Sequence, residues 1–80
     1  MKTFYINKKK NNHVNEYVNS DGDHYSDLIS YNTRVASYNH ITNEMSVYGW
    51  YSRTTATHIN DFLEFYCFDR VTKKEMLDYK

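Results

Sequence analysis

The hydropathy pattern of this chain changes its period at one place, and that change limits the folds open to it. From Glu44 to Ser52 apolar and polar residues alternate, as in a β-strand with one buried face. Beyond Ser52 the apolar residues recur at helical spacing, at Ile59, Phe62, Leu63 and Tyr66. The pattern predicts a strand that leads directly into a core-facing helix of about twelve residues.

Residues around this helix indicate how it begins and what lies beside its apolar stripe. Thr54 or Thr55 is the expected N-cap, whose hydroxyl accepts a free backbone N–H. Cys67 adjoins the stripe, so we expect a buried, structural cysteine. The opposite face would carry Asn60, Asp61 and Glu64.

A second, shorter helix is predicted at the C-terminal end of the chain. Thr72 and Glu75 stand three residues apart and match a capping box. The helix would run from Lys73 to Tyr79 and pack Met76 and Leu77 against the first helix.

The first half of the chain reads as β-strands. Asp21-Gly22 lies between the alternating runs Val14 to Asn19 and His24 to Tyr31, and this pair predicts a hairpin with a type I′ turn. Thr3 to Ile6 is expected to be an edge strand or a frayed terminus.

The run from Asp27 to Asn39 predicts one long strand, which would form a second hairpin with the strand from Glu44 through the loop His40 to Asn43. Its alternation places Ile29, Tyr31, Thr33, Val35 and Ser37 on one face. The other face would hold Leu28, Ser30, Asn32, Arg34, Ala36 and Tyr38.

The fold class predicted is therefore α+β, a small antiparallel meander of three to four strands packed against one main C-terminal helix that a short second helix follows. Residues 1–80 would form a single domain whose basic first twelve residues are its least ordered part.

Composition narrows the compartment and the partners. One cysteine allows no internal disulfide, and no run resembles a signal peptide or a membrane span. We therefore expect a soluble, cytoplasmic protein without membrane contact. The formal net charge is zero, which disfavours nucleic acid as a partner.

Charge is unevenly distributed along this neutral chain. The first twelve residues carry lysines and no acid, whereas Glu16, Asp21, Asp23 and Asp27 dominate the next stretch. These acids form either a solvated hairpin or a polar contact surface.

Nine tyrosines are more than a small core can bury with every hydroxyl bonded. Tyrosine is enriched at recognition surfaces, which favours a binding protein. An AT-rich genome, which favours Asn, Lys and Tyr, is the competing explanation.

The start of the predicted main helix is the sharpest candidate site. No acid occurs between Trp50 and Asp61, although acids usually complement the positive end of a helix. Hydrogen-bond donors and cations replace them, at Ser52, Arg53, Thr54, Thr55 and His58. They form either a site for an anion or a partner's carboxylate, or an ordinary hydroxyl cap with His58 packed on the preceding strand.

A second candidate surface is the sheet face that alternation assigns to Arg34, Tyr38, Tyr48 and Trp50. Its aromatic rings would stack single-stranded nucleic acid, or would form half of the core under the helix.

Catalytic and metal chemistry find little support in the residue spacing. His58 and Asp61 are neighbours on one helix, so they do not orient a base for Ser52. The acidic hairpin departs from a calcium loop in the position of its glycine. Four histidines stand singly, without metal-ligand spacing. We predict a non-enzymatic protein with no metal and no cofactor.

Two segments, SYNTRVASY (Ser30 to Tyr38) and GWYSRTTATHINDFL (Gly49 to Leu63), resemble the core of a family of small, uncharacterised phage-encoded proteins. The resemblance covers nearly half of the chain and implies a phage setting and the host cytoplasm. It transfers no activity. The expected function is that of an accessory protein that binds a host protein, such as an anti-CRISPR-like inhibitor of a defence nuclease complex; a small nucleic-acid-binding regulator is the alternative.

Overall fold

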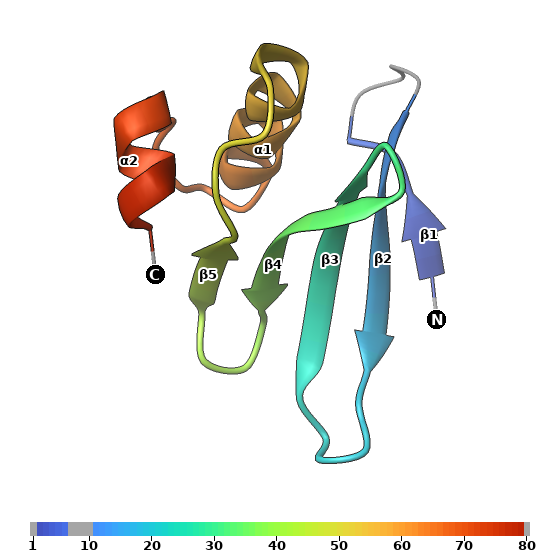
Figure 1. The fold of residues 1–80 in the computed structure, drawn as a ribbon. Helices are drawn as coiled ribbons and strands as arrows, with labels where there is room; N and C mark the ends of the chain where they lie inside the picture. The colour runs from blue at the N-terminus through green and yellow to red at the C-terminus, as the bar shows by residue number, and fades with distance from the viewer. Residues whose placement is uncertain (1, 7–10, 80) are drawn as a thin grey trace.

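A computed structural model describes residues 2–6 and 11–79, which form an antiparallel sheet with two helices (Figure 1). The five strands follow the chain in the order β1-β2-β3-β4-β5. Their bounds are β1 Lys2–Phe4, β2 Asn12–Val18, β3 His24–Ser30, β4 Thr33–Asn39 and β5 Glu44–Val47, and the helices are α1 Arg53–Phe65 and α2 Lys73–Asp78. The α+β class is confirmed, with five strands where three to four were expected, and α1 is the longer helix.

The first hairpin, β2 with β3, is confirmed, but its turn differs from the predicted type. Gly22 has a positive φ of 87°, whereas Asp21 is absent from the positive-φ residues that a type I′ turn requires. The turn is closed by the Asn19 side chain, which accepts hydrogen bonds from the backbone N–H groups of Asp21 and Asp23. The side chain of Asn19 therefore helps to set the backbone conformation here.

The predicted long strand from Asp27 to Asn39 is wrong, because the chain reverses at its centre. Tyr31 and Asn32 have φ values of 50° and 66°, and Ser30 pairs with Thr33 across this two-residue turn. Both central residues have the positive φ that a type I′ hairpin requires. Asparagine tolerates positive φ, but tyrosine does not favour it, so the pair Tyr31-Asn32 is a weak turn signal. The alternation of apolar and polar residues continues through the pair, and for that reason the turn was not predicted.

A β-bulge at the start of β4 reverses part of the predicted face assignment. Leu28 pairs with Ala36 and Ile29 with Arg34, which leaves Val35 as the extra residue. Arg34 thereby joins the face of Asp27, to which it is ion-paired. Val35 and Ala36 are both buried, although they were expected on opposite faces.

Helix α1 lies over one face of the sheet, against β3 and β4. We call this the covered face and the other the open face. The core between sheet and helices contains Val14, Leu28, Val35, Ala36, Tyr38, Met45, Val47, Ile59, Phe62, Leu63 and Met76. The predicted helical stripe is thus confirmed at Ile59, Phe62 and Leu63. In the described part of the chain, neither helix has the length and apolar character needed to cross a membrane.

The N-cap of α1 is Ser52, two or three residues earlier than the threonines expected. Ser52 is extended, and its hydroxyl accepts the N–H of Thr55. Thr54 and Thr55 are instead in the first turn, because the helix already begins at Arg53.

The end of α1 places Cys67 in solvent, so the predicted buried cysteine is wrong. Cys67 has a positive φ of 66°. Its N–H donates to Glu64 and that of Phe68 donates to Leu63, which is the Schellman arrangement that ends a helix. The apolar stripe stops before Cys67 because the backbone turns there.

Helix α2 begins with the predicted capping box, in which Thr72 and Glu75 bond each other's backbone. Met76 is buried as expected, but Leu77 is 61% exposed and does not pack against α1. Asn60 is buried, against expectation. Its side-chain amide donates to the carbonyl of Val71 and accepts the N–H of Val71, so it fastens the segment between the helices.

Candidate functional site

The helix-start residues predicted as one site divide between core and surface. Thr55 and His58 are buried, and both bond the Ser30 hydroxyl of β3 at 3.0 Å. Ser52 uses its hydroxyl as the cap. Arg53 and Thr54 remain exposed. His58 thus bonds a residue of β3, whereas the simple-cap alternative placed it on the strand that precedes the helix.

The four acids of the predicted contact surface also occupy different places. Asp21 is exposed and Asp23 half-buried in the β2–β3 turn. Glu16 lies on the covered face beside His24, and Asp27 is buried on the open face. The cluster visible in the sequence is therefore not one surface in the fold.

The predicted aromatic face separates in the same way. Tyr38 is 9% exposed and belongs to the core. Trp50 is half-buried, with the Lys73 ammonium 4.3 Å from its ring centre. Tyr48 is exposed, and the guanidinium of Arg34 lies 5.3 Å from its ring centre. Of this set, Arg34 and Tyr48 stay together, on the open face.

Asp27 organises the open face. Its carboxylate accepts hydrogen bonds from the hydroxyls of Tyr17, at 2.9 Å, and Ser37, at 2.7 Å. Arg34 adds an ion pair at 3.6 Å. Because Asp27 is only 7% exposed, these partners supply the contacts that a carboxylate removed from water requires.

The tyrosine that is bonded to this carboxylate belongs to an aromatic pair. The rings of Tyr17 and Tyr25 are stacked, with centroids 5.8 Å apart. The pKa of Tyr17 is raised, mainly by partial burial and to a smaller extent by the hydrogen bond to Asp27. Its phenol therefore keeps its proton and remains a hydrogen-bond donor at neutral pH. A shallow depression of about 240 Å³ lies beside them, lined by Tyr25, Ser37, Asn39, Glu44, Ser46 and Tyr48. This face can offer aromatic surface and hydrogen bonds to a flat partner.

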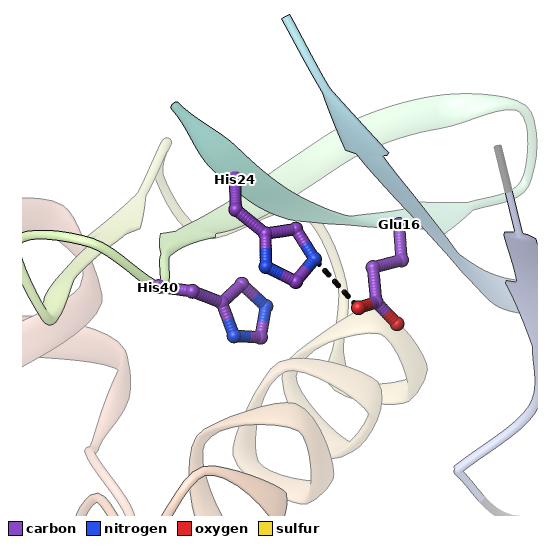
Figure 2. A group of neighbouring side chains, drawn as sticks. All are labelled: Glu16, His24 and His40. Carbon is purple, nitrogen blue, oxygen red and sulfur yellow. Dashed lines mark hydrogen bonds and ion pairs between the residues drawn. The ribbon is translucent and has the colours of Figure 1, made fainter. Parts of the chain in front are cut away.

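A second polar group lies on the covered face, where Glu16 of β2, His24 of β3 and His40, the residue directly after β4, come together (Figure 2). Nε2 of His24 is 2.6 Å from the Glu16 carboxylate. The imidazoles of His24 and His40 are stacked, with centroids 4.1 Å apart. Each of the three residues offers one ligand atom, and these atoms lie within 4.8 Å of one another.

Neighbouring side chains hold this group in place. Nε2 of His40 bonds the Ser26 hydroxyl at 2.7 Å, and the Tyr66 hydroxyl donates to the same oxygen at 2.8 Å. Burial lowers the pKa of His40, and the neighbouring His24 lowers it further, while Glu16 acts in the opposite direction. His40 is therefore held as a neutral imidazole at neutral pH.

Histidine spacing did not reveal this group because its members meet through strand pairing. The N–H of His40 donates to the carbonyl of His24 at 2.7 Å, and Glu16 pairs with Ser26, two residues from His24. The turn at Tyr31-Asn32 brings β4 back along β3, and the extra residue at Val35 shifts the register by one, so that His24 comes to lie opposite His40. The predicted unbroken strand kept them far apart.

Comparison with known proteins identifies a family for this chain but no activity. No curated protein and no solved structure matches the chain. A family model does match, over residues 1–78. The chain therefore belongs to the family of unknown function DUF8033.

Proposed function

We propose that this chain is a non-enzymatic bacteriophage accessory protein that acts by binding a host protein through the open face of its sheet. The observation that carries the proposal is a set of tyrosines on a face that neither helix covers: Tyr17 is bonded to Asp27, Tyr25 is stacked on Tyr17, and Tyr48 lies against Arg34. Tyrosine offers large contact area at a low cost in side-chain entropy.

Preorganisation supports this use of the face. Tyr17 is held by its bond to Asp27 and by stacking on Tyr25, and Tyr48 is held against Arg34. A partner therefore meets rings whose positions are already restricted, which lowers the entropic cost of association. Tyr48, 48% exposed, offers the most accessible ring of this set.

Charge favours a protein partner over nucleic acid. Arg34 is paired with Asp27, and Glu44 lines the depression beside the tyrosines. A backbone of phosphates would meet no excess of positive charge here, since the chain as a whole carries a formal net charge of zero.

The phage setting rests on the resemblance of Ser30 to Tyr38 and Gly49 to Leu63 to phage-encoded proteins. In that setting the partner we propose is a host defence nuclease or its assembly in the host cytoplasm, which the protein would inhibit by occupying a contact surface. The dispersal of the four hairpin acids disfavours inhibition by mimicry of DNA charge.

The test compares two surface variants with the wild-type protein in capture from a host lysate, with partners identified by mass spectrometry. Tyr25→Ser combined with Tyr48→Ser should lose a stoichiometric partner. Tyr51→Ser removes an exposed tyrosine outside this set and should retain it. Equal capture by both variants would contradict the open-face proposal, as would the absence of any stoichiometric protein partner.

Nucleic-acid binding is tested separately, because Arg34 over Tyr48 also suits base stacking. Single-stranded and duplex oligonucleotides are titrated at low ionic strength and again with added salt. We expect no binding. If the protein did bind, with an affinity that falls steeply with salt and is lost in the Tyr48→Ser variant, a nucleic-acid-binding regulator would become the better proposal.

A further inference from the structure

The group formed by Glu16, His24 and His40 has the composition of a transition-metal site. Two imidazoles and one carboxylate are ligands that suit zinc and its first-row neighbours. Their ligand atoms lie within 4.8 Å of one another, and all three residues are half-buried. Such side chains are shielded from bulk water yet within reach of an ion.

We propose that Glu16, His24 and His40 bind a divalent first-row metal ion, with zinc the preferred ion. The ligands are the Glu16 carboxylate, Nε2 of His24 and a ring nitrogen of His40. Before the ion binds, the proton on Nε2 of His24 leaves that nitrogen, and the neutral ring then carries its proton on Nδ1. Three protein ligands leave one tetrahedral position for water or for a ligand from a partner.

The backbone fixes the relative positions of the three ligands. Glu16, His24 and His40 come from, or directly follow, the neighbouring strands β2, β3 and β4, and the N–H of His40 is bonded to the carbonyl of His24. Ligands on paired strands lose little further freedom when an ion binds. They are therefore placed more firmly than ligands on a loop.

The surroundings supply the supporting contacts that metal ligands usually have. Tyr66 donates to Ser26, whose hydroxyl contacts His40. The ring of Tyr38 meets that of His40 edge-on, with centroids 4.8 Å apart. These contacts limit how far His40 can move away from the group.

Binding requires one adjustment of the rings. The imidazoles of His24 and His40 are close to parallel, at an interplanar angle of 16°, so their nitrogen lone pairs run side by side. Rotation of one ring about its Cβ–Cγ bond brings both lone pairs toward one point. The adjacent depression of about 260 Å³, lined by Lys2, Glu16, Tyr17, Val18 and His24, gives room for this movement and a path for the ion.

The experiment uses untagged protein that has been treated with a chelator and dialysed. Isothermal titration with zinc sulfate should give one ion per chain. His24→Gln and His40→Gln should each weaken binding by at least about tenfold, since each removes a direct ligand. His13→Gln is the matched control, because His13 lies outside the group, and it should bind as the wild type does.

A second measurement separates a lost ligand from a lost fold. Circular dichroism checks that each variant is folded, and the imidazole resonances of the wild-type protein are followed by NMR during zinc addition. Those of His24 and His40 should shift, while those of His13 and His58 stay. Absence of stoichiometric zinc binding to the wild type would overturn the proposal, and so would binding that both glutamine variants retain.

Discussion

The two faces of the sheet are stabilised in different ways. On the covered face, apolar side chains of α1 such as Ile59, Phe62 and Leu63 are fully buried against the strands. On the open face, the carboxylate of Asp27 is buried and is surrounded by two hydroxyls and a guanidinium. The covered face combines apolar packing with a few buried hydrogen bonds such as those of Ser30, whereas the buried centre of the open face consists of hydrogen bonds and an ion pair.

This difference leaves the open face available for binding. In a closely packed core, a change in the volume of a side chain lowers the stability of the fold. A face held by one bonded carboxylate can keep its geometry while the outer rings around it vary. Tyr48, whose ring is 48% exposed, can therefore be changed without loss of the fold.

The largest expected effect is on the covered face. Leu63→Ala should lower the free energy of unfolding by about 3–5 kcal/mol, because Leu63 is fully buried and the truncation leaves a cavity. Urea denaturation followed by circular dichroism measures the change. Leu77→Ala is the control: this leucine is 61% exposed, and its loss should cost less than about 0.5 kcal/mol. If the two variants lost a similar free energy of unfolding, the covered face would not depend on its apolar packing as described.

On the open face, Asp27→Ala should cost about 1–3 kcal/mol, since it leaves the hydroxyls of Tyr17 and Ser37 without their acceptor. Asp21→Ala, in the exposed turn, removes the same charge and should have little effect. Equal urea midpoints for the two variants would show that the carboxylate does not organise this face.

A smaller effect is expected from alkaline pH. Burial raises the pKa of Tyr66 above its ordinary value of 10.0, so the folded chain keeps that proton longer than the unfolded chain does. Stability should therefore be unaffected at neutral pH and fall as the pH rises above 10.0.

Urea midpoints measured across this range test the expectation. Tyr66→Phe, which has no phenol to ionise, should show a shallower decline. It will not abolish the decline, because the pKa values of Tyr17 and Tyr79 are also raised by burial. A decline of equal slope in both proteins would assign the effect to other groups.

The smallest stability effect is expected for Tyr48→Ser, within about 0.5 kcal/mol of the wild type, because this ring is 48% exposed. Thermal unfolding measures it. A substantial loss of stability would mean that Tyr48 is part of the folded framework, and the distinction between framework and contact surface would fail there.

Local signals in the sequence predicted the elements whose ends are set by neighbouring residues. The capping box of Thr72 and Glu75 and the hairpin around Asp21-Gly22 are of this kind. The helical stripe through Ile59 and Phe62 is another, because its spacing alone defines a face.

What sequence could not predict depends on pairing between distant strands. The turn at Tyr31-Asn32 lacks a glycine, so its positive φ values are maintained by the pairing of β3 with β4. The bulge at Val35 moves Arg34 to the open face. Without this turn and this bulge, the sequence could not predict which residues share the open face, or that His24 and His40 meet on the covered face.

The order of the strands bears on how quickly the chain folds. Each strand is bonded to the strand next to it in sequence, so the sheet grows by closing short loops, which is the kinetically favourable route. The chain also contains no proline, and the slow isomerisation that delays many refolding reactions has no residue on which to act. A newly made chain can therefore complete its sheet soon after synthesis, without waiting for a slow step.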